Sequence, residues 1–277
     1  MKRLIPILLT CALALGLAGC GDFAPDPTQT PDAAADYSFD RTNFPALAGG
    51  SAQEPLAEAI AAIMLGETRE GVADLLSFGN TQEAWDRLAS GEAGLVLAAE
   101  PDKLPEDVET AVVSRDALVF YVGEGSAVDG MTSAQLKSVM SGGTKSWSGM
   151  GGSGDIAILG RPEGSGSLAA LRRLIGGGSA AVSDSGAALT SAEVLGYGFY
   201  NEAVLMGAAD GYKLLEVDGV APTAENIASG EYPLCVDVLA GISASAADDS
   251  PERALWLWLQ GGVGQAFISS QGYLEAE

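Results

Sequence analysis

Residues 159–167, Leu-Gly-Arg-Pro-Glu-Gly-Ser-Gly-Ser, combine residue types suited to holding an anion. The apolar run at 156–159 predicts a buried strand, and leucines at helical spacing after it predict a helix capped by Ser165 or Ser167. Unpaired N–H groups and the helix dipole favour negative charge at a helix start. Arg161 adds a planar guanidinium that can bind two oxygens of one oxyanion. The segment therefore predicts an anion site, with a flexible Gly-Ser surface turn as the alternative.

Two carboxylates, Glu163 and Glu100, are further candidates for contacting a ligand. Glu163, two residues after Arg161, can hold the guanidinium in place or accept a proton from a ligand. Glu100 directly follows residues 94–99, an apolar run typical of a strand buried on both faces. Open α/β sheets bind ligands beyond the carboxyl ends of such strands, so Glu100 is a candidate site residue. The alternative for Glu100 is a solvated loop acid.

Two earlier segments also place small or polar residues at predicted helix starts. Gly50-Ser51 precedes a predicted helix at residues 55–64. Asn80, with capping-box spacing to Glu83, begins another after a predicted strand at 74–78. Gly50-Ser51 is a second possible anion-binding site or an ordinary cap, and Asn80 marks a third junction of strand, cap and helix.

The beginning of the chain has the order of a targeting segment. Lys2 and Arg3 precede an apolar core at 4–15, and Leu17-Ala18-Gly19-Cys20 resembles the bacterial lipoprotein lipobox. We expect residues 1–19 to be a signal peptide, Cys20 to carry the lipid, and residues 20–42, rich in Pro, Asp, Ala and Thr, to be a flexible tether. The alternative is an ordinary signal peptide with a chance cysteine. No later run approaches the ~18 apolar residues of a spanning helix, which predicts a lipid anchor as the membrane contact.

Composition excludes several classes of function. The chain has 14 basic and 37 acidic residues, a net charge of −23, and no basic patch, which argues against nucleic-acid binding. It has no histidine, which argues against Ser-His-Asp and Cys-His enzymes and most transition-metal sites. After cleavage and lipidation, Cys235 is the remaining thiol, so neither an internal disulfide nor a zinc cluster is expected. We predict no catalytic residue, metal or cofactor.

Strands and helices alternate over more than 200 residues, which predicts an α/β fold with parallel sheets and a length that supports two lobes. Further strands are predicted at residues 117–122, 214–217 and 232–238, and residues 195–200 are predicted to be a strand or a turn. Further helices are predicted at residues 132–140, 201–206, 255–259 and 263–268, with a short helix through residue 227.

In this order, the motifs resemble those of the PstS-like phosphate-binding substrate-binding proteins of bacterial ABC transporters, which have the type 2 periplasmic-binding fold. The resemblance covers residues 44–273. The motifs that carry it are Gly50-Ser51 before Pro55-Leu56, residues 95–101, residues 161–167, Gly196-Tyr197-Gly198-Phe199-Tyr200, residues 218–223, Tyr232-Pro233-Leu234, and Gly264-Gln265 with Gly272-Tyr273.

The resemblance implies two lobes, each a mostly parallel sheet flanked by helices, joined by two crossover hinge strands near residues 118–122 and 234–238. Lobe I would comprise residues 43–120 and 233–277, and lobe II residues 121–232.

The resemblance also implies ligand contacts from the first lobe. Ser51 and the backbone N–H of Ala52 would contact phosphate, as would Thr81 or its neighbour Asn80. Glu100 would stand where the family has an aspartate that accepts the phosphate proton.

From the second lobe, the implied clamp consists of Arg161, Ser165, Gly166 and Ser167. Glu163 would pair with Arg161.

Two departures from the family pattern bear on the ligand. Ala52-Gln53-Glu54 replaces a small or hydroxyl residue followed by an aromatic, which brings a carboxylate near the first anion seat. Glu100 is one methylene longer than the family's aspartate.

The expected function is that of an extracytoplasmic, lipid-anchored, monomeric receptor that binds inorganic phosphate and delivers it to an ABC permease. One alternative is a receptor for another ligand, such as sulfate, molybdate or a phosphorylated metabolite. Another is a sensor of the same fold that has lost transport. A phosphatase using Ser165 is disfavoured, because no histidine or P-loop lysine would activate it.

Overall fold

The structure is a computed structural model that describes residues 37–177 and 194–275. The predicted signal peptide and Cys20 lie outside these residues. The strands are β1 (Leu47–Gly50), β2 (Leu76–Gly79), β3 (Leu95–Ala99), β4 (Val108–Gly123), β5 (Gly130–Met131), β6 (Ala157–Ile158), β7 (Val194–Phe199), β8 (Tyr212–Leu214), β9 (Glu216–Val217), β10 (Cys235–Ser243) and β11 (Leu274–Glu275).

The helices include short 3-10 and π turns, named η. They are η1 (Ser51–Gln53), α1 (Glu54–Leu65), η2 (Glu70–Leu75), α2 (Thr81–Ser90), α3 (Ser133–Met140), α4 (Gly166–Leu174), η3 (Asn201–Leu205), α5 (Ala224–Ala228), α6 (Pro251–Gln260) and α7 (Gly262–Ser270). None of the described helices has the length and apolar character needed to cross a bilayer.

One sheet runs through the described residues in the order β2-β1-β3-β10-β4-β7-β6, with β8 and β11 also paired to β4. The pairings β1–β2, β1–β3 and β6–β7 are parallel, as the alternation of strands and helices predicted. Every pairing that involves β4 or β10 is antiparallel, because β10 returns alongside β4 in the opposite direction. The predicted α/β fold is confirmed, and its antiparallel part comes from these two long strands.

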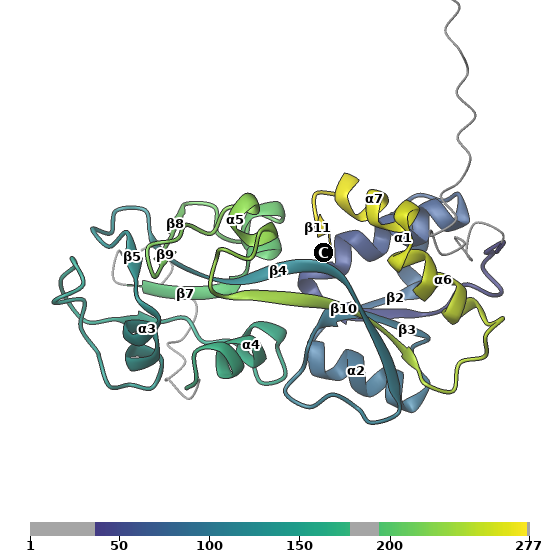
Figure 1. Cartoon of the computed structure of the whole chain (residues 1–277), viewed down its shortest axis with the longest axis horizontal. Helices are drawn as coiled ribbons and strands as arrows, with labels where there is room; N and C mark the ends of the chain where they lie inside the picture. Colours follow the sequence, from purple (N-terminus) through teal and green to yellow (C-terminus); the bar gives the residue numbers. More distant parts are fainter. Residues whose placement is uncertain (1–36, 178–193, 276–277) are drawn as a thin grey trace, which may run out of the picture. The chain divides into compact units, whose positions relative to one another are not determined.

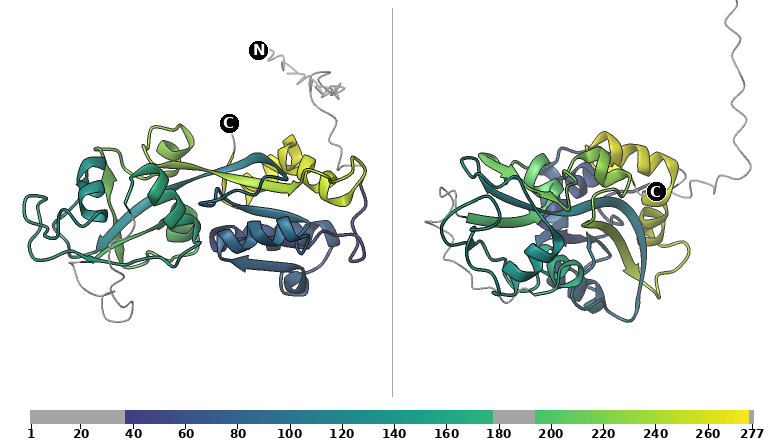
Figure 2. Two further views of the ribbon diagram at one scale, coloured as in Figure 1. Left: turned by 90° about the horizontal axis from the view of Figure 1, so that it is seen from below. Right: turned by 60° about the vertical axis from the view of Figure 1, so that its left-hand side comes forward.

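The two long strands join two lobes. The first lobe holds β1–β3 with α1, α2, α6 and α7, and the second holds β5–β9 with α3, α4 and α5 (Figure 1). β4 and β10 lie side by side from Cys235↔Ala117 to Ser243↔Val108, and the left-hand view in Figure 2 shows them running between the lobes. The predicted hinge segments, residues 118–122 and 234–238, lie on β4 and around the start of β10, and residues 118–122 pair with β7 of the second lobe. Their role as hinges stays a prediction. The exact lobe boundaries predicted from the sequence stay a prediction.

In the first lobe, successive residues of a strand pack into hydrophobic clusters on opposite faces of the sheet. Leu95 and Leu97 of β3 pack with residues of α1 and α6, whereas Val96 and Ala98 pack with α2. This alternation follows from the two-residue period of a strand, and it lets helices cover both faces of the sheet (Figure 1). Trp85 of α2 is fully buried against this second face and donates its indole N–H to the carbonyl of Ala99 (3.2 Å).

The second lobe has its own core around the far end of β4. Leu118 and Phe120 of β4, Leu195 of β7, and Leu168 and Leu171 of α4 are buried in it. Leucines three residues apart place one face of α4 on the sheet, which fixes the start of α4 near the strand ends.

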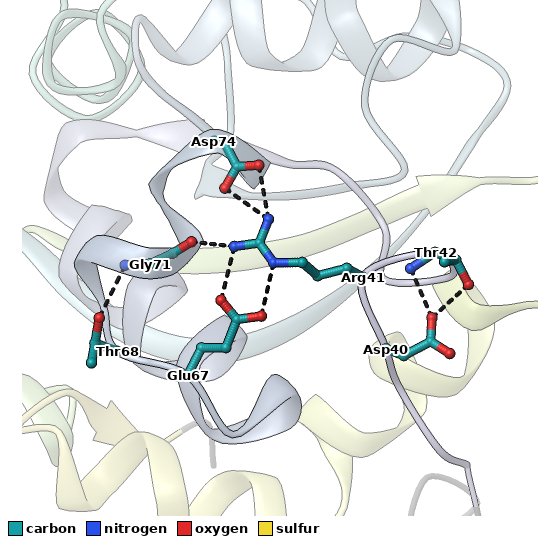
Figure 3. A network of polar contacts seen from close by, with 7 residues as sticks. All are labelled: Asp40, Arg41, Thr42, Glu67, Thr68, Gly71 and Asp74. Carbon is teal, nitrogen blue, oxygen red and sulfur yellow. Dashed lines mark hydrogen bonds and ion pairs between the residues drawn. The ribbon is translucent and has the colours of Figure 1, made fainter.

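The predicted strand at 74–78 begins later than expected. Residues 70–75 form the 3-10 helix η2, and β2 starts at Leu76. Arg41 explains the difference, because its guanidinium binds Glu67, Asp74 and the carbonyl of Gly71 (Figure 3). These contacts hold the chain in a turn up to Asp74, and the ion pairs lower the pKa of both carboxyls.

Candidate anion-binding site

A cavity of about 160 Å³ lies where the end of β1 meets the first turns of α2 and α4. One buried water needs only about 10–15 Å³ on this measure, so the cavity has room for a small oxyanion. Its lining residues are Gly50, Ser51, Ala52, Gln53, Gly79, Asn80, Thr81, Arg161, Pro162, Ser165, Gly166, Ser167, Phe199 and Glu202.

Most of the residues predicted to bind a ligand line this cavity together. They are Ser51, Ala52, Asn80, Thr81, Arg161, Ser165, Gly166 and Ser167. Glu100 and Glu163 are not among the lining residues.

The predicted helix starts surround the cavity. Asn80 is the N-cap residue of α2 and accepts the N–H of Glu83 (3.2 Å). Ser165 holds the N-cap position of α4 but caps no N–H, and its buried hydroxyl has no hydrogen-bond partner among the described residues. The first N–H groups of α4 therefore lack a side-chain cap in a wall that an anion can contact.

Close approach between the lobes depends on glycine. A Cβ at Gly166 of α4 would lie 2.7 Å from the Thr81 hydroxyl oxygen, and one at Gly50 of β1 would lie 2.9 Å from the same oxygen. Thr81 is only 2% exposed. The Thr81 hydroxyl therefore lies between the two lobes at the cavity wall. A larger residue at position 50 or 166 would collide with it.

The Glu202 carboxylate joins Arg161 of the second lobe to Ser51 of the first. Arg161 donates Nε–H to the carbonyl of Tyr197 (2.9 Å) and Nη2–H to one carboxylate oxygen of Glu202 (3.3 Å). The Ser51 hydroxyl donates to the other Glu202 oxygen (3.0 Å). A carboxylate thus binds two of the groups that the sequence assigned to the ligand. Gly198 provides the space for Arg161, because a Cβ there would lie 2.4 Å from Nη2.

The predicted pairing of Glu163 with Arg161 is wrong. Glu163 accepts two hydrogen bonds from Arg172 of α4 (2.7 and 3.0 Å), which lower the pKa of its carboxyl, and its side chain is 78% exposed. The turn through Gly164, which has a left-handed φ of 79°, precedes α4. Glu163 lies on the outer side of this turn beside the exposed face of α4, so the nearest arginine is on the helix.

Glu100 also lies at the rim. Its half-exposed carboxylate is 3.6 Å from Arg173 of α4, in the other lobe. Next to it, Asp102 accepts a hydrogen bond from Arg172 (2.5 Å). The predicted position beyond the end of a buried strand is correct, but the side chain pairs across the lobes at the surface.

Sequence reasoning missed two polar side chains of the cavity wall, those of Glu202 and Gln53. Residues 201–206 were predicted to be helical, and they form the π turn η3 that carries Glu202, but nothing in the local sequence indicated a partner. Gln53 appeared only within a departure from the family pattern. It is 1% exposed, and neither its amide nitrogen nor its oxygen has a partner among the described residues.

A buried carboxyl accepts a hydrogen bond from the residue that precedes Glu202 in the chain. Asp116 of β4 is fully buried and accepts the N–H groups of Ala117 (2.7 Å) and Asn201 (3.1 Å). Burial raises the pKa of Asp116 to about 7, although these hydrogen bonds lower it. The carboxyl links the β4 strand to the start of η3, and thus to the element that carries Glu202.

Two lobes joined by two long strands, with a polar cavity between them, define the class of periplasmic-binding-protein folds. The sequence model of the PBP superfamily domain matches residues 40–243, and the chain belongs to this superfamily. None of the curated proteins compared with the sequence matches it.

Solved structures of phosphate-binding proteins share this fold. One is a candidate phosphate ABC transporter substrate-binding protein from Clostridium perfringens with bound phosphate (TM-score 0.65, 17% identity, 83% of this chain and 98% of the other). Another is an ABC-type phosphate transport receptor from Vibrio cholerae (0.64, 18%, 83% and 99%). A third is a phosphate-binding protein from Stenotrophomonas maltophilia (0.55, 15%, 84% and 91%). At these identities the similarity establishes the fold.

Proposed function

We propose that the protein is an extracytoplasmic receptor that binds inorganic phosphate between its lobes and delivers it to an ABC permease. One observation carries the proposal: donors predicted to bind an anion, from segments far apart in the chain, line a single cavity. Receptors for phosphate and for phosphate transport have the same fold, which agrees with this assignment.

The donor set suits a tetrahedral oxyanion. The cavity wall contains the hydroxyls of Ser51, Thr81 and Ser165, the first backbone N–H groups of α4, and the Arg161 guanidinium. The Ser51 hydroxyl and Arg161 Nη2 also donate to Glu202. Hydroxyls and N–H groups supply hydrogen bonds in several directions, and the guanidinium supplies charge and a planar fork. Because the whole chain is strongly acidic, local donors and dipoles must provide the attraction.

Contacts across the cavity rim favour a ligand held between two closing lobes. Gln82 donates its backbone N–H to the carbonyl of Gly164 (2.9 Å), and the Asn80 amide donates to the carbonyl of Glu163 (2.9 Å). We assign residues 43–120 and 233–277 to one lobe and 121–232 to the other, with closure by bending of β4 and β10.

The membrane attachment in this proposal is a lipid on Cys20, followed by a tether that ends near residue 42. A Cys20→Ser variant should be absent from the membrane fraction, and it should not incorporate labelled palmitate. A variant that incorporates the label like the wild type would contradict this attachment.

Calorimetric titration tests the ligand assignment. The full chain is unfolded to remove bound ligand, refolded, and titrated separately with phosphate and sulfate. Phosphate binding with much weaker sulfate binding is expected. Equal binding of sulfate or molybdate would favour a general oxyanion receptor, and no binding by a folded protein would contradict the receptor assignment in favour of a repurposed sensor.

A further inference from the structure

Buried side chains with unpaired polar atoms fall into two groups. Gln53 and Ser165 line the cavity, whereas Asp116, Asn201 and Arg253 are not among its lining residues. Burying an amide without a hydrogen-bond partner is unfavourable, so such a group in a cavity wall indicates something that binds there. Gln53 is the stronger indication, because both its nitrogen and its oxygen are unpaired.

The position of Gln53 is fixed by its surroundings. It ends the short helix η1, which begins at Ser51 directly after β1. The carbonyl of Ala52, in the same turn, accepts the buried hydroxyl of Tyr273 (2.8 Å). A Cβ at Gly50 would lie 3.1 Å from the Gln53 amide oxygen and 2.9 Å from the Thr81 hydroxyl, so both side chains approach the same end of β1.

We propose that Gln53 contacts the ligand directly and selects an oxyanion that carries a hydroxyl. The inference rests on the proposed function and adds a residue that distinguishes a protonated oxyanion from a fully ionised one. The amide presents a donor and an acceptor side by side in a wall that water reaches poorly. A fully ionised anion has only acceptor oxygens, so it satisfies the nitrogen and leaves the amide oxygen unpaired. A protonated phosphate offers an oxygen to the nitrogen and an O–H to the amide oxygen.

The test compares Gln53→Met with a matched glutamine. Methionine has nearly the same shape but neither donor nor acceptor. The control is Gln265→Met in α7, because the Gln265 amide donates to the carbonyls of Val113 (3.0 Å) and Leu259 (2.6 Å), and Gln265 is not a lining residue. Phosphate and sulfate affinities are measured by calorimetry on the full chain, and the melting temperature of each ligand-free protein is recorded.

Gln53→Met should weaken phosphate binding about 10- to 100-fold and sulfate binding less, because phosphate loses two hydrogen bonds and sulfate one, so that the preference for phosphate over sulfate narrows. Its ligand-free melting temperature should equal or exceed that of the wild type, because no hydrogen bond is lost. Gln265→Met should show the reverse: a lower melting temperature and unchanged affinity. Gln53→Ala serves as a second variant and should also lose phosphate affinity.

Wild-type phosphate affinity in folded Gln53→Met or Gln53→Ala would overturn the inference, and so would an equal loss of phosphate and sulfate binding. A drop in the ligand-free melting temperature as large as that of Gln265→Met would assign Gln53 a purely structural role and also overturn it. None of these outcomes would contradict the proposed function as a phosphate receptor. If the wild type binds neither anion, the proposed function fails first, and the inference fails with it.

Discussion

The Arg41 network and the cavity wall differ in how fully their polar groups are hydrogen-bonded. Arg41 donates to Glu67, Asp74 and the carbonyl of Gly71, so a side chain that is 42% exposed has its donors widely used (Figure 3). In the cavity, Gln53 is 1% exposed and has no partner among the described residues. The surface network pairs groups that water could also satisfy, whereas the Gln53 amide and the Ser165 hydroxyl in the cavity wall, which water scarcely reaches, are unpaired among the described residues.

This difference separates structural from ligand-binding polarity. Exposed ion pairs contribute little to stability, because solvent competes for each partner. The Arg41 network therefore serves mainly to hold the N-terminal segment on η2. Unpaired groups in a buried wall lower stability until something binds them, which is the pattern expected of a preformed ligand site.

The largest effect is expected for Arg161→Ala. Loss of a charged donor in a partly buried wall should weaken phosphate binding about 100-fold or more, because hydrogen bonds to charged groups are among the strongest. Arg41→Ala is the control and should leave the affinity unchanged. Calorimetry on folded proteins, with folding checked by circular dichroism, makes the comparison. Equal affinities of the two variants would show that Arg161 is as structural as Arg41.

A subtler change should move the same guanidinium without removing it. The Cβ of Gly198→Ala would lie 2.4 Å from Arg161 Nη2. Since the clash is with the end of a flexible side chain, the fold should survive while Arg161 shifts, and phosphate affinity should fall about tenfold. Gly125→Ala is the matched control, because a Cβ there meets nothing within 4 Å. If Gly198→Ala binds as tightly as Gly125→Ala, the exact placement of Arg161 is unimportant.

The helix-start part of the site could be predicted from sequence, because its signals are local. Asn80 has its capping partner three residues away, and the segment through Ser165 contains its own strand end, turn and helix start. Apolar runs likewise indicated β3 and the core face of α4, since burial on both faces or on one face leaves a direct trace in the sequence.

The carboxylate partners could not be predicted in this way. Arg161 and Glu202 are 41 residues apart, and their pairing depends on how β7 and η3 lie beside the loop before α4. The local rule placed Glu163 beside Arg161, but side chains two residues apart in a turn can face different directions. The sequence placed Glu100 at the correct strand end. Its ion pair with Arg173 at the surface depends on how the second lobe packs against the first, which the local sequence does not encode.

The smallest effect is expected at the rim. Arg172 of the second lobe pairs with Asp102 of the first (2.5 Å) and with Glu163 beside it (2.7 Å), and all three side chains are partly exposed. Arg172→Ala should weaken phosphate binding only about two- to fivefold, because solvent screens such pairs. The control is Arg87→Ala, since Arg87 pairs with Glu92 within the first lobe (3.4 Å) and cannot influence closure through that contact.

Salt dependence provides the sharper test of this rim contact. If the Arg172–Asp102 pair helps to hold the lobes together over the ligand, sodium chloride should weaken phosphate binding more steeply in the wild type than in Arg172→Ala, because the variant has one fewer pair to screen. The attraction between Arg161 and the ligand is common to both proteins, so it cancels in the comparison. Identical salt slopes in the wild type, Arg172→Ala and Arg87→Ala would mean that the rim pair does not contribute to closure, which would leave the cavity groups alone to hold the bound state.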